Sequence, residues 1–316
     1  MKPRTGLRDR MRAYDLAIRK LAKIERDIVL QTVDAENRIS DLLAGVRDCL
    51  RTDGLPEGVR APAEALFGFA FELLAEFDVR DQQYAAIYAA CPEHMCPFCG
   101  TEYFDAPGAA REALDHYLVR SRYPFAAANL LNLVPMGHKC NSSYKLSSDL
   151  LRRSDGARRV AFDPYNHTRI SVSLDDSDPF DGKTPNTPNW TIRFEPDSRA
   201  VETWDEVFSV KERYRRDHLD PSFAGWLGLF QKWARVMGLQ NESGDEALVG
   251  VLRRYEELWS ESGMQDRAFL KAAVFRLLRR QCEGGHQRLI TQIRSLVAPV
   301  AAPLPIEASV SDGPAG

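Results

Sequence analysis

The chain has 316 residues, of which 44% are hydrophobic and 28% charged, and its net charge is −3 at pH 7. This length predicts two or three packed units, and the composition is that of a globular protein with ample apolar material for a core. The sequence excludes a membrane-spanning segment of ~20 apolar residues, a signal peptide at the N-terminus, and an overall basic charge that would mark the whole chain as a nucleic-acid binder.

Residues 1–90 are expected to form an N-terminal helical region. Apolar residues such as Leu16, Leu21 and Ile28 recur near helical spacing from residue 7 onward. The turn-rich segment 52–58 predicts a break in the helices. Two further helices are expected, over residues 62–77 and 78–90.

Residues 91–165 change to short, turn-rich pieces, as expected of a unit organised by a metal. Cys96 and Cys99 stand two residues apart in Cys-Pro-Phe-Cys-Gly. The six cysteines and the lack of a secretion signal indicate a reducing cytoplasm, where a close pair of thiols is more often a metal knuckle than a disulfide. A strand is expected within residues 111–118 and a closing helix over 141–153.

The remaining chain is divided into three segments. Alternating apolar residues at 170–174 and 190–194 predict a β-hairpin within residues 166–200. Residues 201–297 are expected to be a C-terminal helical region, with breaks at 220–221, 242–244 and 262–263. The tail 298–316 is rich in Ala, Pro and Ser and is expected to be disordered.

The dipeptide Asp115-His116 carries the strongest catalytic signal. An imidazole with an ordinary pKa of about 6.5 can take a proton from water near neutral pH, and a carboxylate is the hard oxygen ligand that Mg²⁺ prefers. Adjacent side chains on a strand point to opposite faces. Asp115 and His116 can therefore serve one site only if the strand ends or bends there.

Basic residues follow this dipeptide. Residues 111–159 contain nine Lys or Arg against four Asp or Glu, inside a mildly acidic protein. Arg120 and Arg122 are the candidates for contacts to a nucleic-acid backbone. Lys145 could neutralise a phosphate oxygen.

Taken together, Cys96-x2-Cys99, Asp115-His116, Asn132-Leu-Val-Pro and Cys140-Asn141-x3-Lys145 resemble the HNH, or ββα-metal, endonucleases over about residues 96–165. The resemblance implies that Asn132 ties the hairpin loop together and that Asn141 is the second protein ligand, with Asp115, of a catalytic Mg²⁺ or Mn²⁺. The expected fold is thus mainly α, with a small ββα-metal nuclease unit and a short β-hairpin.

A structural zinc ion is expected beside this site. Many HNH proteins carry a second Cys-x2-Cys knuckle; here Cys140 fills its second place, but Gly137 stands at the first. The leading ligand set is Cys96, Cys99, His138 and Cys140. Cys91 and His94 are alternative fourth ligands, and the cysteines could instead bind no zinc and pack as small hydrophobic residues.

The expected function is metal-dependent hydrolysis of nucleic acid, DNA more than RNA, with His116 as general base. The motifs are also similar to HNH effectors of bacterial anti-phage systems, which implies an ATPase or sensor subunit as partner. The aromatic-rich helical flanks offer surface for such a subunit or for a second copy of the chain. Two alternatives remain: a zinc-stapled module that binds nucleic acid without cutting it, and a helical interaction scaffold.

Overall fold

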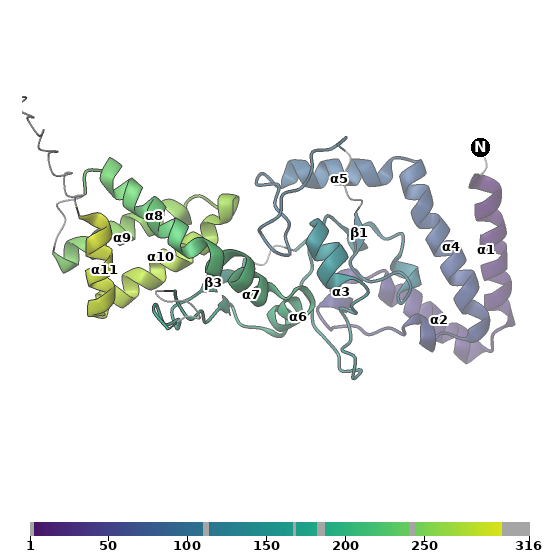
Figure 1. Cartoon of the computed structure of the whole chain (residues 1–316). Helices are drawn as coiled ribbons and strands as arrows, with labels where there is room; N and C mark the ends of the chain where they lie inside the picture. The colour runs from purple at the N-terminus through teal and green to yellow at the C-terminus, as the bar shows by residue number, and fades with distance from the viewer. Residues whose placement is uncertain (1–2, 110–113, 167–168, 182–186, 240–243, 299–316) are drawn as a thin grey trace, which may run out of the picture.

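The computed structural model describes residues 3–109, 114–166, 169–181, 187–239 and 244–298. The described chain is mainly helical, as predicted, with helices at both ends and an irregular middle that contains short strands (Figure 1). None of the described helices is both long enough and apolar enough to cross a membrane. The predicted tail lies outside the described residues, except for Ala298.

The N-terminal region contains five α-helices and one short 3₁₀ turn. The predicted break is confirmed, because residues 44–56 carry only that turn between α3 and α4. Helix α4 begins five residues earlier than predicted, so Pro62 lies inside it. The bounds are α1 Pro3–Lys20, α2 Lys23–Glu36, α3 Ile39–Leu43, η1 Thr52–Gly54, α4 Glu57–Glu76 and α5 Val79–Ala90.

The middle segment holds a minimal antiparallel pair of strands, β1 Asp115–His116 and β2 Leu133–Val134. Asp115 is opposite Val134 and His116 is opposite Leu133. The connection between the strands contains two 3₁₀ turns, η2 Pro124–Ala126 and η3 Leu130–Asn132. The strand predicted within 111–118 is therefore confirmed for two residues, and residues 111–113 lie outside the described part.

A single turn of π-helix, η4 Cys140–Lys145, follows the strands. The prediction of one helix over 141–153 was wrong. Leu146 has a φ of +47°, in the left-handed region, so the backbone leaves the helical path directly after Lys145. The residues that follow turn back to pack Leu150 and Leu151 into the core.

The predicted hairpin is confirmed. Strands β3 Ser171–Ser173 and β4 Arg193–Glu195 pair antiparallel, with Val172 opposite Phe194. Both of these side chains are buried in the main core, which explains the alternation of apolar and polar residues in the sequence.

The C-terminal region is helical, as predicted, and the break near 262–263 is confirmed. The break expected at 220–221 was wrong: Pro221 lies in the first turn of α8, where a proline needs no N–H partner. The break at 242–244 falls mostly outside the described residues. The bounds are α6 Arg199–Phe208, α7 Val210–Arg213, η5 Tyr214–Leu219 (π-helical), α8 Asp220–Val236, α9 Asp245–Ser260, η6 Gln265–Arg267, α10 Ala268–Glu283 and α11 Gln287–Val297.

One main core links the middle segment to the C-terminal helices, running from Ala35 through Cys96 and Phe208 to Val297. A smaller core joins the N-terminal helices to the connection between β1 and β2. There Phe125 packs edge-on against Tyr14 and Phe67, at ring-centre distances of 6.3 and 5.1 Å. The irregular middle is thus held from both sides.

Candidate active site and metal cluster

A cluster of three thiols and one carboxylate forms where the Cys-x2-Cys turn meets η4. The ligand atoms of Cys96, Cys99, Glu102 and Cys140 lie within 4.8 Å of one another. The three cysteines are buried. Three thiolates and a carboxylate form a four-ligand set suited to a tetrahedral zinc ion, so these residues fit the metal.

Glu102 was not foreseen as a ligand, and Gly137 explains why it can be one. A Cβ atom on Gly137 would lie 2.2 Å from Glu102 Oε2, so any side chain there would collide with the carboxylate. The Lys139 N–H also donates to Glu102 Oε1, at 3.2 Å. Glu102 therefore takes the space that the absent cysteine of the second knuckle leaves.

The structure places Glu102, and not His138, in this cluster. His138 is exposed. The alternative ligands Cys91 and His94 are not members either, within the described residues. His94 stacks on Tyr88 with its ring centre 3.7 Å away and the planes 5° apart.

The C-terminal helices close over the cluster with three polar side chains. The buried Arg213 guanidinium donates to Cys140 Sγ at 3.1 Å and lies 3.9 Å from Glu102 Oε2. The Tyr214 hydroxyl donates to the Cys99 carbonyl and Trp204 Nε1 to the Phe98 carbonyl. Arg213 places a positive charge beside a group of anionic ligands. Hydrogen bonds among the thiols lower the pKa of Cys99, while burial raises that of Cys96.

His116 is held in one tautomer by the connection between the strands. Its Nε2 atom lies 2.9 Å from the Ala127 carbonyl oxygen, which can only accept a hydrogen bond. Nε2 must therefore carry the proton, and Nδ1 holds the lone pair. Burial lowers the pKa of His116, so the imidazole is neutral and able to accept a proton at neutral pH.

Asp115 is paired with Lys145. The Lys145 ammonium, only 2% exposed, donates to Asp115 Oδ2 at 2.9 Å. Lys145 therefore joins η4 to β1, and its charge acts first on this carboxylate, whereas the sequence predicted a phosphate contact. Asn141 is half-buried and lies about one π-helical turn before Lys145 on η4.

Asn132 makes the loop hydrogen bonds that the resemblance implied. Its Oδ1 accepts from the Leu118 N–H at 2.6 Å, and its Nδ2 donates to the carbonyls of Leu118 and Ala126 at 3.0 and 3.1 Å. The side chain is fully buried. It ties the residues after His116 to those that precede Ala127, the hydrogen-bond partner of His116.

The two arginines expected to contact nucleic acid lie on the same connection but in different surroundings. Arg120 is exposed, with its guanidinium 5.7 Å from the Phe71 ring centre. Arg122 is half-buried and lies 3.7 Å from the carboxylate of Asp149.

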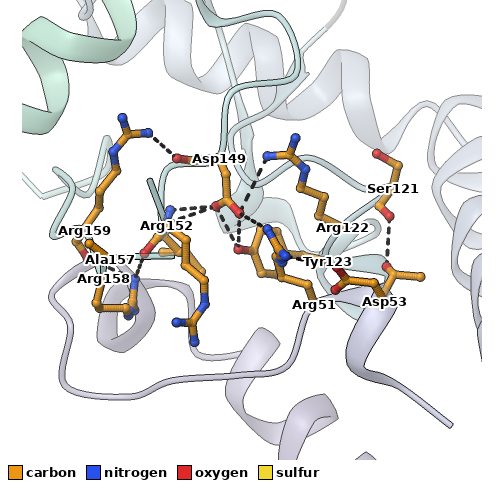
Figure 2. Close-up of polar contacts among 12 residues, drawn as sticks. Arg51, Asp53, Ser121, Arg122, Tyr123, Asp149, Arg152, Ala157, Arg158 and Arg159 are labelled. Carbon is orange, nitrogen blue, oxygen red and sulfur yellow. Dashed lines mark hydrogen bonds and ion pairs between the residues drawn. The ribbon is translucent and has the colours of Figure 1, made fainter. Parts of the chain in front are cut away.

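Asp149 fixes the shape of this loop. Figure 2 shows its buried carboxylate between the Tyr123 hydroxyl, which donates at 2.8 Å, and the guanidinium groups of Arg51 and Arg122. The Thr52 N–H also donates to the Arg122 carbonyl, at 2.9 Å. Arg122 therefore belongs to a structural network, and less of its side chain is exposed to a substrate than in Arg120.

Glu36 is a further residue that sequence reasoning missed. This buried carboxyl at the end of α2 accepts from the Ala126 N–H at 3.1 Å, one residue before the carbonyl that holds His116. Burial raises the pKa of Glu36 to about 8, although hydrogen bonds from Ala126 and Phe125 act to lower it. Only the fold could reveal it, because 90 residues separate the two partners.

We expect Glu36→Gln to make the protein more stable at pH 8. The ordinary pKa of this carboxyl is 4.5 and the folded value about 8, so the unfolded chain loses the proton first as pH rises. Stability should fall by about 1.4 kcal/mol per pH unit between those values in the wild type, and this fall should be much smaller in the variant. Denaturant unfolding at pH 5 and pH 8 measures this fall in the free energy of unfolding. Asp27→Asn, at an exposed position on the same helix, is the control. If the free energy of unfolding depends equally on pH in the wild type and both variants, the pKa of Glu36 is not raised in the folded protein.

No family model, curated protein or solved structure matches this chain.

Proposed function

We propose that this chain is a metal-dependent HNH endonuclease that hydrolyses phosphodiester bonds of nucleic acid, most readily DNA. The observation that carries the proposal is the state of His116: a neutral imidazole, fixed by the Ala127 carbonyl at Nε2, which leaves the lone pair on Nδ1. It stands beside Asp115 on a short strand pair that is followed by the helical turn carrying Asn141 and Lys145. A general base needs this tautomer control, whereas a residue that serves only packing does not.

In this reaction His116 Nδ1 takes the proton from the attacking water. Asp115 and Asn141 offer the hard oxygen atoms that hold Mg²⁺ or Mn²⁺. When bound, the ion would supply positive charge at the scissile phosphate and the leaving oxygen. The ion pair with Lys145 engages Asp115 Oδ2, so Lys145 orients the carboxylate and offsets its charge when no ion is bound. The thiol cluster would act as a structural zinc site that fixes η4 against the Cys-x2-Cys turn.

The same ion pair favours one alternative, a module that binds nucleic acid without cutting it. In such a module the ion pair between the buried Lys145 and Asp115 would be a permanent structural contact. No divalent ion would then be needed at Asp115. The two functions differ in their response to metal, which makes metal dependence the decisive measurement.

The test is incubation of the pure protein with supercoiled plasmid, single-stranded DNA and RNA, in Mg²⁺, Mn²⁺ or EDTA. We expect plasmid to be nicked or linearised with either ion and to remain intact in EDTA. Asp115→Asn keeps the shape of the side chain but removes its charge. This variant should fail to cleave the plasmid even when Mg²⁺ or Mn²⁺ is present. Binding without cleavage under every metal condition would favour the binding module, and cleavage in EDTA would remove the metal from the mechanism.

A further inference from the structure

A pocket of about 400 Å³ opens between the N-terminal helices and the connection that holds His116. Helix α1 contributes Arg10, helix α4 contributes Gly68 and Phe69, and the connection contributes Arg120 and Ala127. The pocket lies in the size range of small-ligand sites. It can accept one nucleotide and is too small for a duplex.

One wall of the pocket is a cationic platform, the Arg10 guanidinium beside the Phe69 ring. The Arg10 guanidinium lies 4.2 Å from the centre of the Phe69 ring, and its Nη1 donates to the Gly6 carbonyl at 3.0 Å. A Cβ atom on Gly6 would come within 2.9 Å of that nitrogen and 3.4 Å of Phe69. Glycine at position 6 thus leaves room for the guanidinium beside the Phe69 ring, and planar guanidinium groups stack on nucleobases.

A second glycine lines the pocket from the facing helix. Gly68 lies inside α4, where glycine disfavours a helix relative to alanine. A Cβ atom there would meet nothing within 4 Å. The absence of a side chain is therefore not required by packing, and its effect is to leave the pocket open.

The pocket borders the candidate catalytic base. Ala127 lines it and is also the residue whose carbonyl accepts from His116. Phe71, on α4, has its ring centre 4.3 Å from the His116 ring and lies beside Arg120. A strand bound at His116 would therefore meet Arg120 and then the pocket.

The charges around the pocket are mixed. Glu64 and Glu72 flank Gly68, each one helical turn away, and both line the pocket with exposed side chains. Two carboxylates disfavour a continuous run of phosphates but accept hydrogen bonds from the amino groups of a base. This pattern suits one base flanked by one phosphate.

We propose that this pocket binds a single unpaired nucleotide of the substrate strand, next to the bond that is cut. The base stacks on the Arg10 guanidinium, its amino group reaches Glu64 or Glu72, and Arg120 contacts the flanking phosphate. The inference rests on the proposed nuclease function for the identity of the strand. It predicts that a strand is cut faster when the nucleotide beside the cut is unpaired than when the same nucleotide is held in a duplex.

The test uses Gly68→Trp, which should fill the pocket, and Gly58→Trp on the same helix as matched control. Gly58 also has open space around its Cβ position and does not line the pocket. Binding of a fluorescent single-stranded 12-mer is measured without added Mg²⁺ or Mn²⁺ and without chelator, where no cleavage is expected and the zinc stays bound. We expect Gly68→Trp to weaken binding at least about tenfold, the effect of one lost stacking contact. Gly58→Trp should stay within about twofold of wild type.

Arg10→Gln provides a second variant that removes the platform without adding bulk, and it should weaken binding similarly. Wild-type affinity in both Gly68→Trp and Arg10→Gln would overturn the pocket assignment, whatever the enzyme cleaves. Hydrolysis of a small phosphodiester such as bis(p-nitrophenyl) phosphate tests the catalytic centre separately. If the wild type cleaves no diester but strand binding depends on the pocket, the nuclease proposal fails and the nucleotide site stands.

Discussion

His116→Ala is expected to lower phosphodiester cleavage by roughly 10²–10⁴-fold, the usual contribution of a positioned general base. The variant should fold, because the imidazole is only partly buried and its one polar contact in the described structure is to the Ala127 carbonyl. That carbonyl lies next to a pocket and can be solvated when the imidazole is gone. Nucleic-acid binding should therefore persist while turnover is lost.

The measurement is single-turnover cleavage of plasmid DNA in Mg²⁺, with circular dichroism to check the fold. His286→Ala is the matched control. It removes an imidazole at the start of α11, in the helical region at one end of the molecule, whereas β1 lies in the middle (Figure 1). Cleavage by His116→Ala at a rate close to that of the control would remove His116 from the mechanism and leave the nuclease proposal without its base.

Cys96→Ser and Cys140→Ser are expected to abolish zinc binding and to unfold the segment around the knuckle. Both thiols are fully buried, and a metal-organised turn has little core of its own once the ion is lost. Elemental analysis should find one zinc per wild-type chain and much less in these variants. Cys282→Ser, which changes a buried cysteine outside the cluster, controls for loss of a core thiol.

The fourth ligand can be identified by the same measurement. Glu102→Ala should lose zinc, whereas His138→Ala should retain it. In the double variant Glu102→Ala with Gly137→Cys, a thiol replaces the carboxylate in the space that Glu102 occupies, and zinc binding should return. If His138→Ala loses zinc and Glu102→Ala keeps it, the fourth ligand is His138, as expected from the sequence. Active protein without zinc would show that the cluster is not a zinc site.

The positions of Asp115, His116 and Asn132 illustrate what local sequence could predict. The Asp-His dipeptide, followed by an asparagine before Leu-Val-Pro, predicted a strand pair with a tied loop through its resemblance to the HNH family. The structure has that pair and those hydrogen bonds. The periodic helices and the β3–β4 hairpin were predictable because each depends on residues close together in the chain.

Other features differ from the sequence-based expectation where a segment packs against residues that are distant in sequence. The helix expected over 141–153 stops at Lys145, where Leu146 adopts a positive φ and the next residues pack into the core. Lys145 has the expected position but bonds to Asp115, because β1 passes beside η4 only in the folded chain. The candidate ligand Glu102, which the sequence-based prediction did not include, left one signal in the sequence, the glycine at position 137.

By itself, the sequence determined the mainly helical class, the order of the helical and strand segments and which residue types stand together in the middle of the chain, since composition, periodicity and motif spacing are local properties. Only the tertiary structure decided which groups meet: Glu102 with the three thiols, Arg213 closing over them, and Glu36 on the loop that holds His116. The physical reason is that these contacts depend on how distant segments pack: Arg213 is 73 residues from Cys140 and Glu36 is 90 residues from Ala126. Pairing over such distances depends on the whole core.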